Sequence, residues 1–258
     1  MTKTPTHQYT RSELLAVMSS RLLTDGQIVF AGIGIPLLAA SLAQQRQAPQ
    51  LTILFEGGAV GPAYRPGELP LTTNDQRCIR RASAALAITD VLLLLQRGYV
   101  DVGFMGGAQI DRYGNLNSSF IGDPASPKVR LPGTGGGNDI NSFPKIVVAM
   151  EHEKRRFVPR VDFVTSPGWL DGGETRAKCG LTEGGPWRVV TDLAILGFDD
   201  ETREMKVLAL HPGVTLDEVQ GNTGFELRCE GNLERTELPM REEIEVLRHL
   251  DPERRFTG

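Results

Sequence analysis

Glu56 has the clearest potential for chemistry, because it follows an apolar run and precedes two glycines in the stretch LTILFEGGAVG, residues 51–61. The apolar run, with β-branched and aromatic members, predicts a strand buried on both faces. Glu56 would end that strand, and open α/β sheets bind ligands beyond the carboxyl ends of their strands. Gly57 and Gly58 carry no side chain that would shield the carboxylate. Glu56 is therefore a candidate nucleophile or base, although a strand-ending acid held in a salt bridge fits the same pattern.

The densest glycine cluster is KVRLPGTGGGN, residues 128–138, which contains Gly133, Gly135, Gly136 and Gly137. The Gly-Lys-Ser/Thr that completes a Walker loop does not follow, so the pattern does not favour nucleoside triphosphate binding. Backbone N–H groups in such a loop can bind an oxyanion or a phosphate. A merely flexible loop fits the cluster equally well.

A third stretch, GGAQID at residues 106–111, brings small residues up to an amide and a carboxylate. Tyr113, Gly114 and Asn115 follow it as a predicted turn. The small residues indicate a close approach of backbone or ligand, and a tight hairpin at a sheet end explains the same pattern.

Gly32 and Gly34 stand between a predicted strand over residues 27–31 and a predicted helix over 37–46. With the strand that ends at Glu56 they complete a βαβ unit, whose two strands should be parallel and adjacent. A dinucleotide site begins in the same way, with Glu56 on a ribose hydroxyl. The third glycine of that fingerprint is replaced by Leu37, which disfavours this alternative.

The remaining periodicity predicts alternating helices and short strands, with Thr10 or Ser12 capping the first helix. Predicted helices cover 12–23, 82–97, 215–223 and 239–250, and predicted strands cover 100–105, 146–150, 161–166, 189–196 and 206–210. We expect the helix over 82–97 to be buried. Residues 61–81 lack a period and directly follow Glu56, so they predict a long loop that lines the site.

The composition is that of a globular chain: 258 residues, 40% hydrophobic and 23% charged, predict a single domain, 1–258. A net charge of −4 favours a small-molecule ligand over nucleic acid or an anionic membrane. Three cysteines without C-x-x-C spacing indicate neither a disulfide framework nor a metal site. The polar start MTKTPTHQYTR and the lack of a stretch of roughly 20 apolar residues predict a soluble, cytoplasmic protein without a leader.

Several motifs occur in order along nearly the whole chain. They are GIGIP at 32–36, FEGG at 55–58, GGAQID at 106–111 with GN at 114–115, PGTGGG at 132–137 and HPGV at 211–214. Together they resemble the β subunits of family I coenzyme A transferases. HEKRRFV at 152–158 and DFVTSPGWLDG at 162–172 are most similar to the glutaconate CoA-transferase β subunit, with the 3-oxoadipate CoA-transferase β subunit next.

The resemblance implies an open three-layer α/β/α domain with a mostly parallel central sheet. It implies that Glu56 is the catalytic nucleophile, which forms a glutamyl-CoA thioester between two half-reactions. Other implied site residues are Gly135, Gly136 and Gly137 for the oxyanion and CoA, Gln109 to orient the carboxylate, and Gly32, Gly34, Gly57 and Gly58 in the substrate loop. A coenzyme A thioester would be a substrate, and no tightly bound cofactor or metal is expected. Because the chain carries only the β-type motifs, we expect a separate α subunit as its partner.

The sequence departs from the family pattern at two positions. Gly57 stands where serine or asparagine is common, and Ala31 replaces an asparagine of the succinyl-CoA branch. The same fold also occurs in ring-opening acyl-CoA hydrolases, in which Glu56 would act as a base, and in a decarboxylase. The acid at Glu56 favours CoA transfer to a (di)carboxylic acid over decarboxylation. Hydrolysis stays open as the alternative, and a dinucleotide-binding oxidoreductase subunit is less favoured.

Overall fold

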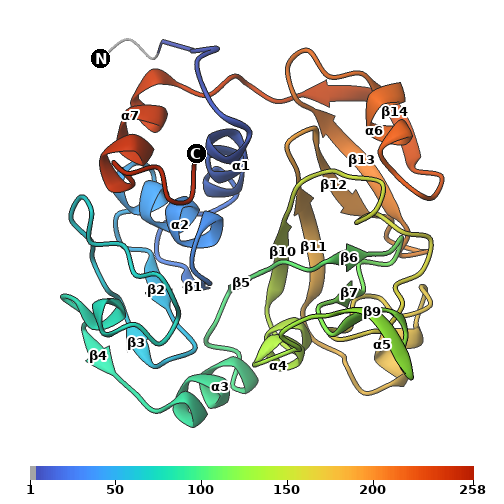
Figure 1. Ribbon diagram of the computed structural model, residues 1–258, viewed down its shortest axis with the longest axis horizontal. Helices are drawn as coiled ribbons and strands as arrows, with labels where there is room; N and C mark the ends of the chain where they lie inside the picture. Colours follow the sequence, from blue (N-terminus) through green and yellow to red (C-terminus); the bar gives the residue numbers. More distant parts are fainter. Residues whose placement is uncertain (1–3) are drawn as a thin grey trace. The chain divides into compact units, whose positions relative to one another are not determined.

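The structure is a computed structural model that describes residues 4–258. The chain divides into two compact units (Figure 1). The first unit comprises Met1–Phe104 and Glu237–Gly258, and the second comprises Met105–Thr236. The start of the polar N-terminal segment, residues 1–3, lies outside the described residues. That the units fold together as a single domain stays a prediction.

The first unit is built on the predicted βαβ motif. Its elements are α1 (Arg11–Ser20), β1 (Ile28–Phe30), α2 (Ile35–Gln45), β2 (Thr52–Leu54), β3 (Ala59–Val60), the 3₁₀ helix η1 (Gln76–Ile79), β4 (Ala84–Ala85), α3 (Ile88–Gln96), β5 (Val102–Met105) and α7 (Arg241–Leu250). The strands follow the order β5-β1-β2-β3-β4. β1 pairs in parallel with both β2 and β5, whereas β2–β3 and β3–β4 are antiparallel. The predicted parallel, adjacent strands on either side of α2 are therefore confirmed.

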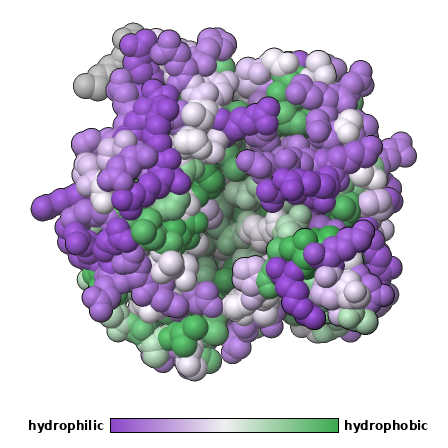
Figure 2. All heavy atoms as spheres, viewed as in Figure 1, coloured by the Kyte–Doolittle hydropathy of each residue, from purple (hydrophilic) through white to green (hydrophobic). Residues whose placement is uncertain are grey.

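The helix predicted over 82–97 is shorter and more exposed than expected. Ala84 and Ala85 pair with β3 as a strand, so the helix begins only at Ile88. Ile88 and Leu93 are 50% and 38% exposed, and Tyr99 just beyond the helix is 56% exposed. Figure 2 shows hydrophobic residues at the surface over α3, at the bottom of the view. The prediction of a buried helix was wrong because only Val91 and Leu95 of this helix are buried.

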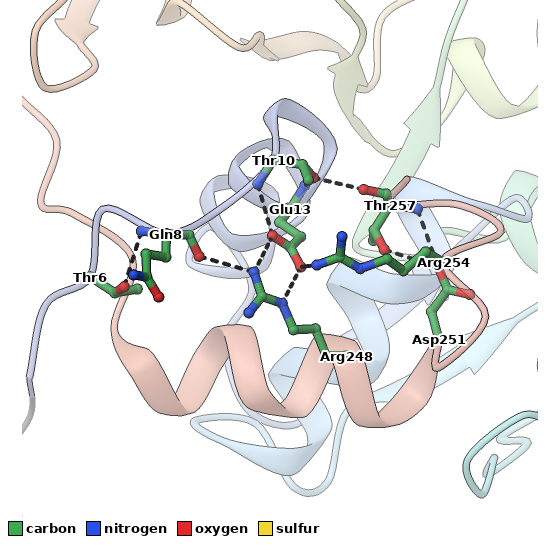
Figure 3. A network of polar contacts seen from close by, with 8 residues as sticks. All are labelled: Thr6, Gln8, Thr10, Glu13, Arg248, Asp251, Arg254 and Thr257. Atoms are coloured by element: carbon green, nitrogen blue, oxygen red, sulfur yellow. Dashed lines mark hydrogen bonds and ion pairs between the residues drawn. The ribbon is translucent and has the colours of Figure 1, made fainter.

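Helices α1, α2 and α7 pack against one another (Figure 1). Thr10 caps α1 in a capping box with Glu13, as the sequence predicts. The fully buried Glu13 carboxylate accepts hydrogen bonds from the Arg248 guanidinium, at 2.7 Å from Nε and 3.1 Å from Nη2 (Figure 3). The Thr10 hydroxyl donates to the Thr257 carbonyl at 2.7 Å (Figure 3). These contacts join the first helix to the last helix and the C-terminal tail.

The second unit is a five-strand arrangement with a hairpin-rich insertion before it. Its elements are β6 (Gln109–Ile110), β7 (Leu116–Asn117), β8 (Phe120–Asp123), β9 (Ser126–Arg130), α4 (Gly137–Ser142), β10 (Lys145–Ala149), α5 (Thr175–Lys178), β11 (Gly185–Val190), β12 (Ala194–Phe198), β13 (Met205–Leu210), α6 (Leu216–Gly221) and β14 (Arg228–Arg235). β10–β11 and β13–β14 are parallel, and β11–β12 and β12–β13 are antiparallel. Strands β6 and β7 form the expected hairpin around the turn at residues 113–115.

Two strand predictions in this unit need correction. Residues 189–196 are not one strand, because a turn separates β11 from β12. In this turn the Thr191 hydroxyl oxygen accepts hydrogen bonds from the Leu193 and Ala194 amides. Residues 161–166 form a loop in place of a strand. Its end makes one bridge, Leu116 to Ser166, and the Asp162 amide donates to the Gln109 side chain instead of to a backbone carbonyl. Within residues 4–258, no helix has the length and apolar character that crossing a bilayer would require.

Candidate active site

Glu56 lies in the β-turn that joins β2 to β3. The Gly58 amide donates to the Phe55 carbonyl at 2.9 Å, which closes the turn, and the Phe55 amide donates to the Ala59 carbonyl at 3.0 Å. Phe55 is fully buried, whereas the next residue, Glu56, is half-buried. The chain reversal therefore places the carboxylate at the carboxyl end of a parallel strand, where α/β proteins bind ligands.

Gly57 and Gly58 are required by the chain's own packing. A Cβ atom on Gly58 would lie 1.9 Å from the Leu86 carbonyl oxygen, and the φ of Gly58 is 102°. A Cβ atom on Gly57 would lie 2.5 Å from the Thr73 carbonyl oxygen and 2.8 Å from Asn74 Oδ1. These contacts explain why Gly57 replaces a larger residue here. Their predicted role in exposing the carboxylate to a substrate stays a prediction.

The loop over residues 61–81 packs beside this turn and is held by internal hydrogen bonds. Asp75 caps η1, and hydrogen bonds from Arg77 hold the pKa of its carboxyl well below the usual range. The buried Cys78 thiol donates to the Thr72 carbonyl, and burial raises its pKa to about 11. The thiol is therefore protonated at neutral pH and is a poor nucleophile. Glu56 remains the candidate nucleophile of this region.

The turn after β1 lies beside the Glu56 turn. β1 and β2 are in parallel register with Phe30 opposite Leu54, and the Ala31 amide donates to the Leu54 carbonyl at 3.0 Å. Gly34, with a φ of 88°, precedes α2, whereas Gly32 has open space around its Cβ position. The turns that carry the predicted residues of the first unit therefore share one strand edge. A substrate contact for Gly32 and Gly34 stays a prediction.

Gln109 in β6 is buried and engaged by hydrogen bonds within the second unit. Its Oε1 accepts from Asn117 Nδ2 at 2.7 Å and from the Asp162 amide at 3.1 Å, and its Nε2 donates to Asp162 Oδ2 at 3.2 Å. Asp162 Oδ2 also accepts from the Gly122 amide at 2.8 Å. Gln109 thus joins the 161–166 loop to the β6–β7 hairpin, and Asp162 joins the same loop to the β8–β9 hairpin. An orienting role of Gln109 toward Glu56 stays a prediction.

The rest of the GGAQID and GN motifs also builds a scaffold. Asp111 accepts hydrogen bonds from the Tyr113 and Asn115 amides and from Asn115 Nδ2, while burial raises the pKa of its carboxyl. Asn115 Oδ1 in turn accepts the Gly168 amide at 2.8 Å and the Leu170 amide at 3.1 Å. These bonds attach the SPGWLDG segment to the β6–β7 hairpin.

The glycine loop, residues 133–137, leads directly into α4. The Gly133 amide donates to the Ser118 carbonyl at 2.8 Å, which ties the loop to the residue after β7. The Gly137 amide donates to the Thr134 carbonyl at 2.7 Å, so it is already engaged as the loop is folded. Gly135, with a φ of 49°, lies at the exposed part of the loop, and Gly136 is buried. Binding of an oxyanion or CoA by Gly135, Gly136 and Gly137 stays a prediction.

The two histidines of the resemblance motifs are buried structural residues. His152 bonds through its two ring nitrogens to the Thr191 and Thr223 hydroxyls, at 3.1 and 2.9 Å, and its ring stacks on Phe157. Burial lowers the pKa of His152 to about 4, so its ring is neutral near pH 7. His211 bonds to the Thr236 hydroxyl and the Thr191 carbonyl. Among the described residues, His, Cys, Asp and Glu side chains form no group of three or more suited to a metal ion.

Sequence analysis missed Arg176, Asn117 and Asp162. Asp162 lies in a resemblance motif, which was the available signal, but its neighbours along the chain do not reveal its bonds to Gln109 and Gly122. Arg176 stands in the polar stretch GGETRAK, which looks like any exposed turn in sequence, yet its side chain is among the most buried of the chain.

Comparison with known proteins assigns this chain to a family and its fold to a class. A family model described as Coenzyme A transferase matches residues 12–222. The crystal structure of glutaconate coenzyme A-transferase from Acidaminococcus fermentans superposes with a TM-score of 0.90 at 36% identity, covering 97% of this chain and 98% of that chain. The match confirms the predicted α/β fold class.

Curated relatives span nearly the whole chain. It is 38% identical over 245 residues to the B subunit of 3-oxoadipate CoA-transferase from Pseudomonas knackmussii, with 94% of each chain covered. It is also 38% identical over 255 residues to the B subunit of glutaconate CoA-transferase from Acidaminococcus fermentans, covering 96% of this chain and 95% of the relative. A cholesterol ring-cleaving hydrolase IpdB subunit of Mycobacterium tuberculosis is 31% identical over 248 residues, covering 94% of this chain and 95% of the relative. The chain belongs to the coenzyme A transferase family, which confirms the resemblance drawn from the motifs.

Proposed function

We propose that this chain is the β subunit of a CoA-transferase that moves CoA between an acyl-CoA and a (di)carboxylic acid of the glutaconate or 3-oxoadipate kind. The observation that carries the proposal is the half-buried Glu56 at the carboxyl end of β2, in a chain 38% identical to the B subunits of two CoA-transferases. Family membership favours an acyl-CoA enzyme over the dinucleotide-binding alternative.

Glu56 acts as the nucleophile in both half-reactions. Its carboxylate attacks the thioester carbonyl of the acyl-CoA, and CoA leaves as thiolate from the mixed anhydride. The thiolate then attacks the glutamyl carbonyl, which releases the donor acid and leaves a glutamyl-CoA thioester. The acceptor carboxylate attacks this thioester, and the expelled thiolate attacks the acceptor's acyl carbonyl. A new acyl-CoA forms and the Glu56 carboxylate is regenerated.

The tetrahedral species of each step carries an oxyanion that needs hydrogen-bond donors. We assign this role to backbone amides of the glycine loop, with Gly135 to Gly137 as the candidates. One well-placed donor contributes roughly 3 kcal/mol to transition-state stabilisation. The Gly137 amide donates to the Thr134 carbonyl at 2.7 Å and must leave it to serve as an oxyanion donor. Gln109 would orient the Glu56 carboxylate, and Gly32, Gly34, Gly57 and Gly58 would border the substrate.

A separate α subunit completes the enzyme in this proposal, and the complex works in the cytoplasm on CoA thioesters. The two transferase relatives are themselves named as B subunits of their enzymes. The exposed apolar side chains on and beside α3, Ile88, Leu93 and Tyr99, provide surface of the kind that protein interfaces bury. Nucleic acid, a membrane and a tightly bound cofactor have no part in this mechanism.

The test is to combine this chain with a candidate α subunit, such as the product of a neighbouring gene, and to assay a panel of dicarboxylyl-CoA donors and acids. We expect the chain alone to be inactive and the complex to transfer CoA with ping-pong kinetics. Release of free CoA into water without an acceptor acid would instead assign the hydrolase alternative, in which Glu56 acts as a base.

A further inference from the structure

Arg176 is a fully buried cation whose side chain contacts carbonyl groups. Its Nη1 donates to the Pro167 carbonyl at 3.2 Å and to the Gly168 carbonyl at 3.0 Å. Its Nη2 donates to the Asn141, Ser142 and Glu183 carbonyls at 2.9, 3.1 and 3.0 Å. Within the described residues, no carboxylate pairs with Arg176, so five backbone oxygens compensate the buried charge.

Burying a protonated guanidinium costs desolvation free energy, which indicates that Arg176 has a specific structural role. Desolvation lowers the pKa of Arg176 to about 10, so the group keeps its charge at neutral pH. A buried charge without a partner of opposite sign is among the least favourable groups in a protein interior. A planar fork with five N–H donors is the side chain that can bind several carbonyls from different segments at once.

The carbonyls belong to three segments: the end of α4 and two segments that lie outside it. Asn141 and Ser142 lie at the C-terminal end of α4, and Glu183 lies in the turn before β11. Pro167 and Gly168 follow Ser166. The Asn141 side chain adds a direct link between two of these segments, because its Nδ2 donates to the Pro167 carbonyl at 2.8 Å. Arg176 and Asn141 together fix the spacing between α4 and the 166–168 segment.

That spacing matters at the other end of α4, where the glycine loop begins. A Cβ atom on Gly137 would lie 2.9 Å from Ser166 Oγ, so the 166–168 segment packs directly beneath the entrance to the helix. Gly184 lies against the exit, because its Cβ atom would be 2.3 Å from the Phe143 carbonyl oxygen. Residues next to the carbonyls that Arg176 binds therefore pack against both ends of α4.

We propose that Arg176 is a positioning residue, which holds α4 and the 166–168 segment at a fixed spacing and thereby sets the geometry of the glycine loop for the oxyanion. The proposal rests on the CoA-transferase function argued above. Arg176 touches no substrate in this account and acts through Gly136 and Gly137.

The kinetic test compares Arg176→Lys with Arg188→Lys in the complex with the α subunit. Lysine keeps the charge, but a single ammonium group cannot bind five carbonyls in three segments. We expect Arg176→Lys to lower kcat at least tenfold while the KM for acyl-CoA changes less than threefold. Arg188 is also a partly buried arginine of the second unit, but it donates to the Trp187 carbonyl and stacks on the Trp187 ring. Arg188→Lys should stay within twofold of the wild type.

Hydrogen exchange provides a readout that does not depend on activity. In Arg176→Lys, the amides of Gly137 and Ile140 should exchange at least tenfold faster, whereas those of β12 should keep their wild-type rates. If Arg176→Lys does not fold, Asn141→Ala tests the same spacing with Arg176 in place, and it should lower kcat in the same direction by a smaller factor.

The outcomes separate the two proposals. Unchanged kcat and unchanged exchange in both variants would overturn the positioning role while transfer by the wild type stands. An activity loss that disappears when rates are divided by the number of thioester-forming sites would mean that Arg176 only supports folding, which also overturns the proposal. A wild-type complex that transfers no CoA would remove the proposed function, and the exchange rates would then decide whether Arg176 holds the loop.

Discussion

The two glycine-rich regions of this chain use glycine for different reasons. In the Glu56 turn, backbone atoms of Leu86 and Thr73 occupy the space that side chains on Gly58 and Gly57 would need. In the glycine loop, nothing lies within 4 Å of a Cβ atom on Gly133, whereas Gly137 at the helix entrance is closely packed. The turn is therefore fixed by its own packing. The loop is exposed at Gly135, and at its other end Gly137 packs against Ser166.

The polar residues of the motifs also differ between the Glu56 turn and the second unit. Glu56 is half-buried at a turn, whereas Gln109 and His152 are buried with hydrogen bonds to side chains of the second unit. The motifs shared with the family thus contain residues that build the second unit, such as Gln109 and His152, beside Glu56, which stays the candidate nucleophile. Sequence alone does not separate the two kinds of residue.

The largest expected effect is a loss of folding stability when Gly58 in the Glu56 turn is replaced. Gly58→Ala places a methyl group on the Leu86 carbonyl and forces a φ of 102° on a residue with a Cβ atom. We expect a loss of about 3 kcal/mol or more in the free energy of unfolding, or failure to fold. Gly32→Ala is the control, with open space and no positive φ, and should change stability by less than about 1 kcal/mol. Denaturant titration measures both, and equal losses would contradict the packing account.

The pH dependence of the free energy of unfolding tests whether the buried, neutral His152 ring stabilises the second unit. Its folded pKa of about 4 lies below the ordinary value of 6.5, so the unfolded chain takes up the proton first as the pH falls. The stability that the neutral ring contributes is complete above pH 6.5 and is lost between pH 6.5 and 4, by about 3 kcal/mol at most.

Replacement of the ring should remove this loss. We expect the free energy of unfolding of His152→Gln to fall less steeply than that of the wild type over this window. The exposed His249 on α7 provides the control, because His249→Gln should keep the wild-type slope. Parallel slopes for wild type and His152→Gln would show that the ring does not titrate differently on unfolding.

Gln109 has a smaller expected effect, which separates orientation from scaffolding. Gln109→Ala and Asn117→Ala both remove the 2.7 Å hydrogen bond between these side chains, and each should cost about 1–3 kcal/mol of stability. If Gln109 also orients Glu56, kcat of the complex should fall further in Gln109→Ala than in Asn117→Ala. Equal kcat values would leave Gln109 with its scaffold role alone.

Local patterns predicted most of the first unit. Thr10 caps α1, and the parallel β1 and β2 enclose α2, because capping, periodicity and strand length act over a few neighbouring residues. The helix predicted over 82–97 exists but begins only at Ile88, because Ala84 and Ala85 pair with β3 as a strand. The apolar side chains of this helix would be buried only against a neighbouring element, which the sequence does not reveal.

The candidate site likewise contains residues that have a local sequence signal and residues that have none. Glu56 was predicted from an acid between an apolar run and two glycines, which is a local signal, and its role as nucleophile stays a prediction. Arg176 was not identifiable, because its five carbonyl partners come from segments up to 35 residues away and carry no side-chain signature. The turn at Thr191 was also missed. The stretch 189–196 is apolar on both sides of Thr191 and Asp192, and the Thr191 hydroxyl, which accepts two backbone amides, divides it into two strands.

The most direct test of the central claim is to locate the covalent intermediate. The complex is incubated with acyl-CoA without an acceptor acid, treated with hydroxylamine, digested and analysed by mass spectrometry. A glutamyl-CoA thioester at Glu56 predicts a hydroxamate on the peptide that contains Glu56, formed only after acyl-CoA is added and absent in Glu56→Ala. Glu245→Ala, which removes an exposed acid on α7, should label like the wild type. Release of free CoA with no label on this peptide, or a label on another residue, would contradict Glu56 as the nucleophile.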